Sequence, residues 1–203
     1  MNFVFLISGK LHAGKNTVAD MIQELLTDYT VQQMSLAEPL KNMCKKSFEP
    51  LTKYLNDTLD ECAFPDQPMN NDEIWFEKKN DISRLILQIV GTDIIRNHID
   101  KNYWVNILVD RINDYFEDGS NRVVICNDIR FLNEIDIGAS SNETIYKIRI
   151  NRQNEASIGQ DHISESELDK YDAWDFIIDN CGTLDLLKMN VVNMLKEFRM
   201  IKE

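Results

Sequence analysis

Residues 3–20 read FVFLISGKLHAGKNTVAD, and this stretch decides how the rest of the chain is interpreted. The run from Phe3 to Ile7 is continuously apolar and β-prone, which is typical of a strand buried on both faces of a parallel sheet. A glycine-containing loop follows, and from Thr17 to Leu26 apolar residues recur at helical spacing. A strand, a glycine-rich loop and a helix in this order present backbone N–H groups and a helix dipole to an anion.

The loop fits the phosphate-binding template G-x-x-x-x-G-K-[ST] at every fixed position except the last. Gly9, Gly14 and Lys15 match it, whereas Asn16 stands where a hydroxyl is expected and Thr17 follows one place later. Asn16 has no hydroxyl, but its side-chain oxygen can bind Mg²⁺ directly or through water. The alternative is a tight strand-to-helix turn without a ligand. We expect a phosphate site, because the first strand of an α/β chain is the context that the motif requires.

Strands and helices alternate along the rest of the chain. Further strands are predicted at 31–36, 123–126, 144–150 and 176–178, and further helices at 39–48, 82–97, 103–116 and 184–198. The helix over 82–97 is expected to be interrupted near Gly91, and the polar stretches 57–81 and 151–171 are expected to be loops. This alternation predicts an α/β fold with a five-stranded parallel sheet.

Composition narrows the class of partner. A chain of 203 residues suits one domain, and a net charge of -12 repels nucleic-acid polymers and anionic membranes while leaving room for a small phosphorylated ligand. No run approaches the about 18 apolar residues of a membrane span, and the apolar residues at the N-terminus indicate a buried strand, not a signal peptide. Four cysteines without metal-ligand spacing indicate reduced thiols in a cytoplasmic protein.

Six segments, in order along the chain, resemble the bacteriophage-type deoxynucleoside monophosphate kinases, in which G-K-D-T often replaces G-K-[ST]-T. The segments are SGKLHAGKNTVAD, SLAEPLK (35–41), LQIVGTDIIRNHIDKNYWV (87–105), NDIRFLNEID (127–136), DHISESEL (161–168) and DFIIDNCGTLDLL (175–187). Asn16 is then the amide counterpart of that aspartate. The resemblance implies a three-layer α/β/α fold of the P-loop type, with an acceptor-binding mobile insertion at about 57–81 and a short lid at about 151–171.

The resemblance also implies a donor site for ATP with Mg²⁺. Asp128 and Arg130 follow a buried strand, where ligands gather in open α/β sheets. We expect catalytic roles for Lys15, Asp128, Arg130 and Arg152, metal binding by Asn16 and Asp128 (directly or through water), and ATP binding by Gly9, Gly14, Lys15, Asn16, Thr17, Asn180, Gly182 and Thr183. The alternatives are a surface salt-bridge turn at Asp128–Arg130 and a solvated loop arginine at Arg152. Arg149 is the weaker candidate because it lies inside a strand.

The acceptor site is expected on a separate set of residues. Arg84 and Gln88 are four apart and share a helix face. The resemblance places this segment on the acceptor, which implies that Arg84 grips its phosphate and Gln88 binds an edge of its base. The alternative is a solvated helix face for Arg84 and a helix cap at Gly91. Trp104 either stacks on the base or fills the core, and Glu134 either serves the acceptor site or orients Arg130. The expected acceptor residues are Lys41, Arg84, Gln88, Gly91, Thr92, Trp104 and Glu134.

The predicted function is transfer of the γ-phosphoryl group of ATP to a deoxynucleoside monophosphate (dNMP), giving ADP and the diphosphate. One alternative is a small-molecule kinase that resembles animal-type phosphomevalonate kinase. The other is a nucleotide sensor without turnover, which Asn16 and Ala13 keep open. We expect ATP and dNMP as partners, no nucleic-acid polymer and no membrane. We also expect a cytoplasmic location, which is the host cytoplasm if the source is viral. A homodimer is left open because many relatives are dimers.

Overall fold

The computed structural model describes residues 1–47, 81–117, 119–137, 143–152 and 166–202. The chain divides into two compact units. One consists of Met1–Leu36 together with Val105–Glu203, and the other of Ala37–Trp104. The predicted mobile insertion at 57–81 lies almost entirely outside the described residues, as does the middle of the predicted lid. That the chain is a single kinase domain therefore stays a prediction.

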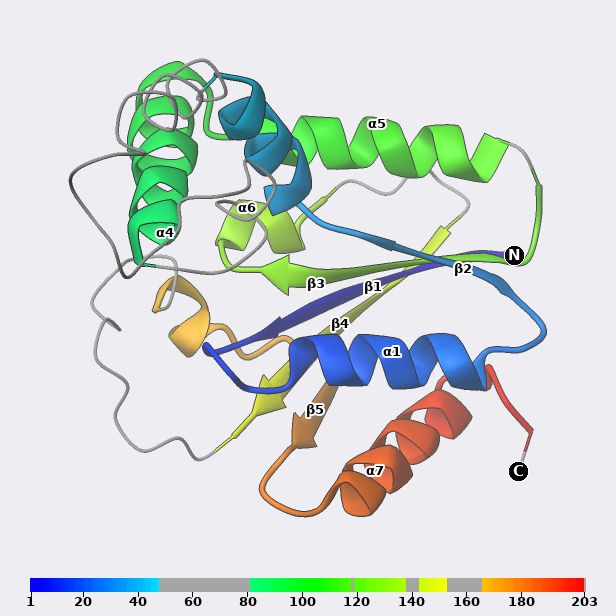
Figure 1. Ribbon diagram of the computed structural model, residues 1–203. Helices are drawn as coiled ribbons and strands as arrows, with labels where there is room; N and C mark the ends of the chain where they lie inside the picture. Colours follow the sequence, from blue (N-terminus) through cyan, green and yellow to red (C-terminus); the bar gives the residue numbers. More distant parts are fainter. Residues whose placement is uncertain (48–80, 118, 138–142, 153–165, 203) are drawn as a thin grey trace, which may run out of the picture. The chain divides into compact units, whose positions relative to one another are not determined.

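A five-stranded, all-parallel sheet organises the first unit (Figure 1). Its strands lie in the order β2-β3-β1-β4-β5, so β1 is central, with β3 on one side and β4 on the other. The bounds are β1 Asn2–Gly9, β2 Thr30–Met34, β3 Arg122–Ile129, β4 Glu143–Asn151 and β5 Phe176–Asp179. The five predicted strands are all present, and β1 is buried from Phe3 to Ser8, as its apolar run indicates.

Helices cover both faces of this sheet and give the three predicted layers. On one face, α1 (Lys15–Leu25) and α7 (Leu184–Glu197) pack their apolar sides on the core strands (Figure 1). On the other face lie α5 (Tyr103–Glu117) and the short α6 (Leu132–Ile135). The cluster under α1 and α7 includes Phe5, Ile125 and Ile148 from three adjacent strands. The predicted α/β/α fold is therefore confirmed.

The second unit is helical where it is described. Residues 37–47 form a helix, and α4 (Asp81–Gln88) continues directly into η1 (Ile89–Ile99), whose turns are wider and of the π type. The helical path runs through Gly91, and the interruption predicted near this residue takes the form of a change from α to π geometry between Gln88 and Ile89. A Cβ on Gly91 would lie 2.5 Å from Leu40 Cδ2, so the glycine allows the two helical segments of this unit to approach closely.

Two further boundaries differ from the sequence prediction. The second strand ends at Met34, and the helix after it begins at residue 37, ahead of Pro39. The polar stretch predicted as a loop at 151–171 contains a single short helix of the 3₁₀ type, η3 (Glu167–Lys170), among its described residues. Within the described part of the chain, no helix is long and apolar enough to cross a membrane.

Candidate nucleotide-binding site

The phosphate loop joins β1 to α1 and has the backbone geometry that the motif predicts. Gly14, directly before the helix, has φ +97°, a left-handed conformation that favours glycine. A Cβ on Gly9 would lie 2.7 Å from the carbonyl oxygen of Ile150, so the first glycine is required by close contact with β4. Both fixed glycines therefore have a local physical reason.

Lys15 folds its side chain back across the loop. Its Nζ donates hydrogen bonds to the carbonyl oxygens of Gly9, at 2.7 Å, and of Lys10, at 2.8 Å. These bonds place the ammonium inside the curve of the loop, at the start of α1, where the N–H groups of a helix N-terminus attract an anion. The structure thus brings together Gly9, Gly14 and Lys15 as the sequence predicts.

The ends of β4 and β5 fix the far side of the same loop. Asn180 Nδ2 donates to the carbonyl oxygen of Ala13 at 2.9 Å, and a Cβ on Gly14 would lie 2.5 Å from that nitrogen. Arg152 Nη1 donates to the carbonyl oxygen of His12, which has a left-handed φ of 61°, at 3.3 Å. Asn180 and Arg152, both predicted as site residues, therefore lie against the phosphate loop and position its backbone.

The other predicted donor residues after β5 shape the start of α7. Thr183 caps this helix, because its hydroxyl oxygen accepts a hydrogen bond from the N–H of Leu186 at 3.3 Å. Gly182 precedes the cap, and a Cβ there would lie 2.6 Å from Leu186 Cδ2. These contacts give both residues a structural function, and their contact with the donor nucleotide stays a prediction.

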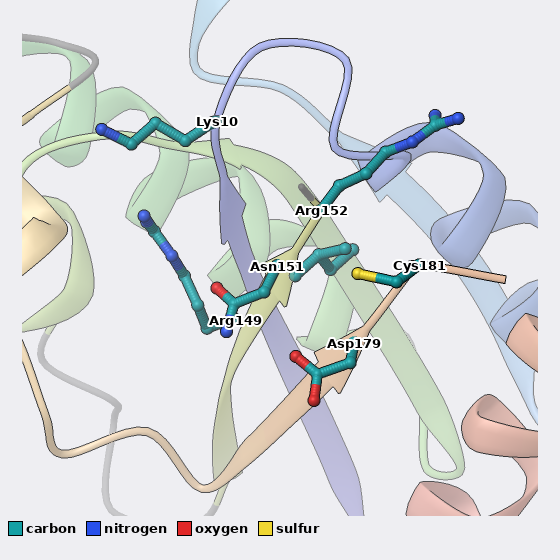
Figure 2. Close-up of a pocket in the computed structure, with 7 residues that line it drawn as sticks. Lys10, Arg149, Asn151, Arg152, Asp179 and Cys181 are labelled. Carbon is teal, nitrogen blue, oxygen red and sulfur yellow. The ribbon is translucent and has the colours of Figure 1, made fainter. Parts of the chain in front are cut away.

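A pocket of about 580 Å³ opens beside the loop at the carboxyl ends of β4 and β5 (Figure 2). It is lined by Lys10, Arg149, Ile150, Asn151, Arg152, Asp179 and Cys181. Ligands of open α/β sheets bind at this edge, beyond the carboxyl ends of the strands. Three cations and one carboxylate line the pocket of a protein whose net charge is -12, so its lining is locally suited to an anion.

The candidate metal ligands are Asp128, near the carboxyl end of β3, and Asn16, in the first turn of α1. Asn16 Oδ1 accepts from Asn127 Nδ2 at 3.4 Å, which links the residue after the loop lysine to the end of β3. Within the described residues there is no group of three or more His, Cys, Asp or Glu side chains that could hold a metal ion. The Asn16 amide and the Asp128 carboxylate offer oxygen donors of the kind that Mg²⁺ takes, and this ion usually keeps several waters and binds through substrate phosphates plus one or two protein oxygens.

Asp128 is held by several donors. Its Oδ2 accepts from Ser35 Oγ at 2.6 Å, and its Oδ1 accepts from the N–H of Leu36 at 3.1 Å and from Cys126 Sγ at 3.3 Å. Burial raises the pKa of the Cys126 thiol well above its ordinary value, and the charge of Asp128 raises this pKa further, so the thiol stays protonated and donates. Asp128 therefore ties the end of β2 to β3. This arrangement fits a contact to Mg²⁺ through water better than direct ligation.

Arg130 begins a turn whose backbone is fixed by Glu134. Glu134 is 5% exposed, and its Oε2 accepts from the N–H groups of Arg130, at 2.7 Å, and Phe131, at 3.0 Å. A buried carboxylate bound by two backbone donors holds the turn rigid. Of the two roles predicted for Glu134, these bonds favour orientation of Arg130.

The predicted acceptor residues belong to the second unit, except for Glu134. Trp104 is 9% exposed, and its indole N–H donates to the carbonyl oxygen of Gly91 at 3.0 Å, so in this structure the ring is a buried packing element. Thr92 is also buried, whereas Gln88 and Lys41 are half-buried. Arg84 lies in α4, and its side chain is outside the described residues. The acceptor assignments stay predictions.

Sequence reasoning missed two charged residues, Arg96 and Lys10, and discounted a third, Arg149. Arg96 of η1 is buried and donates to the carbonyl oxygen of Lys101 at 3.3 Å. Lys10 and Arg149 line the pocket, and both contact Asp169 of η3. The available signal for Arg149 was a charge between two apolar residues of the strand, Ile148 and Ile150, which the sequence interpretation discounted for its place in the strand.

The fold and the loop define a P-loop kinase-like protein, and comparison with known sequences identifies the family. The sequence profile of deoxynucleotide monophosphate kinases matches residues 54–191, which is more than half of the chain. The chain belongs to the deoxynucleotide monophosphate kinase family, so the predicted resemblance and the predicted class of enzyme, an ATP-dependent phosphotransferase, are confirmed.

Two relatives match over nearly their whole length. A protein of Acanthamoeba polyphaga mimivirus, provisionally named a deoxynucleotide monophosphate kinase, is 28% identical and aligns over 95% of both chains. The deoxynucleotide monophosphate kinase of enterobacteria phage T4 is 27% identical, with 97% of this chain and 99% of that protein aligned. Among solved structures, a dephospho-CoA kinase from Campylobacter jejuni is similar with a TM-score of 0.50 and 16% identity, covering 97% of each chain. This likeness supports the fold alone.

Proposed function

We propose that this protein transfers the γ-phosphoryl group of ATP to a deoxynucleoside monophosphate, with Mg²⁺ as the metal. The observation that carries the proposal is the phosphate loop, in which Lys15 is directed into the loop by two carbonyl oxygens and Gly14 adopts a left-handed conformation before α1. Family membership and the names of the two viral relatives support a nucleotide acceptor over mevalonate phosphate.

The loop residues would act by positioning and charge. The N–H groups at the start of α1 and the Lys15 ammonium would hold the β- and γ-phosphates of ATP, and Asn180 and Arg152 would keep the loop in shape through Ala13 and His12. In the transition state of phosphoryl transfer, the transferring group spreads its charge over its equatorial oxygens, so a fixed positive charge lowers the activation barrier. No covalent enzyme intermediate is needed.

Mg²⁺, when bound, would neutralise charge on the β- and γ-phosphate oxygens. Asn16 Oδ1 is the direct protein ligand that fits best, and the Asp128 carboxylate fits a contact through water, because three donors already hold it. Arg130 would face the transferring group from the turn that Glu134 fixes. Gln88, Arg84 and Lys41 remain the proposed acceptor-binding side chains.

A coupled assay of ADP release tests the function. Each dNMP and NMP is offered in turn with ATP and Mg²⁺, next to arms that contain mevalonate phosphate or no acceptor. Turnover is expected with at least one dNMP and not with mevalonate phosphate. Tight ATP binding without turnover on any acceptor would instead indicate the nucleotide sensor. Omission of Mg²⁺ should abolish turnover, and light scattering of the purified protein tests for a homodimer.

A further inference from the structure

Asp169 bridges two cations that come from different parts of the fold. Its Oδ2 lies 2.5 Å from Lys10 Nζ, in the phosphate loop, and its Oδ1 lies 3.1 Å from Arg149 Nη2, in β4. The side chains of Lys10 and Asp169 are 35% and 38% exposed, so solvent and small solutes reach the bridge. One carboxylate therefore neutralises both cations at the edge of the pocket.

Arg149 is oriented from three sides. In addition to Asp169, its guanidinium donates to Ser8 Oγ at 3.2 Å and lies over the ring of Trp174, 5.7 Å from the ring centroid. Its side chain is only 12% exposed. A planar guanidinium held in one direction offers its N–H donors in a fixed geometry, which suits two oxygens of a carboxylate or a phosphate.

A ligand in the pocket could contact both cations of this pair. Lys10 and Arg149 both line it, and in Figure 2 their charged ends extend toward the same side, whereas Arg152 extends in the opposite direction. Lys10 follows Gly9 directly, and Lys15 binds the carbonyl oxygens of both residues. The pair is thus part of the wall next to the proposed phosphates, separate from Arg152.

We propose that Lys10 and Arg149 form a phosphate-binding position, and that the Asp169 carboxylate is the internal counter-ion that a nucleotide phosphate replaces. The proposal rests on the proposed function, because the phosphate belongs to a nucleotide held by the loop. Exchange is physically reasonable, since the Lys10–Asp169 side of the bridge is partly exposed and therefore weak, and a phosphate offers the same two cations more oxygens and more charge. Asp169 then sets how tightly the empty site accepts phosphate.

The competing explanation is that Asp169 only anchors η3 to the sheet. In that case its removal would loosen the helix and leave phosphate binding unchanged. Asp169→Asn separates the two explanations, because it keeps the size of the side chain but removes the charge that competes with phosphate. Asp136→Asn is a matched control. The Asp136 carboxylate lies 3.4 Å from Lys147 Nζ, and neither residue lines the pocket.

Calorimetric titration with inorganic tripolyphosphate, and with adenosine as an uncharged probe, measures the effect. Asp169→Asn is expected to bind tripolyphosphate up to about fivefold more tightly, the range that an exposed ion pair allows, with adenosine binding unchanged. Asp136→Asn is expected to match the parent protein with both probes. Tripolyphosphate affinity that is unchanged or weaker in Asp169→Asn would overturn the proposal.

Lys10→Gln is a second, independent test of the proposed phosphate position, and it can be used even if Asp169→Asn does not fold. It should weaken tripolyphosphate binding, and the double variant Lys10→Gln/Asp169→Asn should show a smaller gain from the loss of Asp169 than the single variant does. Such coupling is the signature of two residues that act on one ligand position. Normal tripolyphosphate affinity in Lys10→Gln would contradict the proposal on its own.

Titrations with ATP and with each dNMP identify the source of the phosphate. A gain for ATP alone places the position on the donor, and a gain for dNMP alone places it on the acceptor. These are binding measurements without turnover. The proposed function is judged separately by the ADP-release assay on the parent protein, so the failure of one can be told from the failure of the other.

Discussion

The phosphate loop and the helical segment from Asp81 to Trp104 both contain residues that the sequence predicts for a nucleotide site, but the fold uses them differently. In the loop, the predicted residues lie against one another, with Lys15 bound to Gly9 and Asn180 bound to Ala13. In the helical segment, Trp104 and Thr92 are buried, and the tryptophan binds the carbonyl oxygen of Gly91.

This difference follows from the chemical groups that bind the ligand in the phosphate loop and in the acceptor site. A phosphate loop binds through backbone N–H groups, so its sequence needs only glycines and one lysine at fixed spacing. An acceptor site binds through side chains, and the same side chain can serve either packing or a ligand. A motif therefore describes the loop well and the helical segment poorly.

The largest effect is expected at Lys15. Lys15→Ala removes the charge that the loop carbonyls direct toward the phosphates, so kcat/KM should fall by roughly two to three orders of magnitude. Thermal stability should change little, because the Gly9 and Lys10 carbonyl oxygens that the ammonium binds are only partly buried. Lys188→Ala, on the exposed surface of α7, is the matched control. A loss of less than about tenfold in Lys15→Ala would remove the loop from the donor site.

Arg130→Lys should come next. A guanidinium can meet two oxygens of the transferring group, whereas an ammonium is a point charge, so kcat should fall by roughly 10² or more with KM for ATP changed less. Arg84→Lys serves as the contrast from the helical segment, and it should mainly raise KM for dNMP. Near-normal kcat in Arg130→Lys would make the Asp128–Arg130 turn structural, with Arg152 the next candidate.

Asn180→Asp tests the support of the loop. Asparagine donates to the carbonyl oxygen of Ala13, whereas an ionised aspartate can only accept, so the bond is replaced by repulsion. KM for ATP should rise by about tenfold with KM for dNMP unchanged. Asn2→Asp loses the same kind of bond, to the carbonyl oxygen of Gly119, at the opposite end of β1 from the loop, and should leave KM for ATP near the parent value. Equal effects of the two changes would mean that Asn180 does not act on the loop.

The sequence predicts the fold well because buried parallel strands are continuous apolar runs. Such a run can be recognised from its own residues, without knowing which strands lie beside it. It also predicts Gly9 and Gly14, since each is required by local backbone geometry or by one close contact. It cannot show that Asp169 meets Lys10, because this bridge joins residues 159 positions apart. Nor can it show that Asn180 reaches Ala13, since that contact depends on the strand order β1-β4-β5.

A smaller effect is expected at Asn16, where the template and the chain disagree. Asn16→Asp keeps an oxygen toward the metal and should stay within about threefold of the parent activity, whereas Asn16→Ala offers no oxygen and should lose about tenfold. The loss should shrink as Mg²⁺ is raised, and a Mg²⁺ titration of both variants measures it. The same activity in the Asp and Ala variants at all Mg²⁺ concentrations would exclude position 16 from the metal shell.

The smallest effect on activity is expected at Trp104. This residue tests whether the helical segment uses its predicted acceptor residues for packing, in contrast to the phosphate loop. Trp104→Phe keeps an aromatic ring but loses the N–H that binds the carbonyl oxygen of Gly91, and leaves a small void. The free energy of unfolding should fall by about 1 to 2 kcal/mol, and KM for dNMP should stay within about twofold of the parent value. Urea unfolding and steady-state kinetics measure the two quantities.

Trp174→Phe provides a matched loss of an indole hydrogen bond, because Trp174 Nε1 donates to the carbonyl oxygen of Tyr171 at 2.8 Å. Trp174 is only half-buried, so its change should lower stability less than Trp104→Phe does. The decisive result is the pattern at Trp104. A raised KM for dNMP at unchanged stability would mean that its indole faces the acceptor base during catalysis, and that the helical segment rearranges when nucleotide binds. Lower stability with an unchanged KM would fix Trp104 as packing and leave Gln88 and Arg84 to recognise the acceptor.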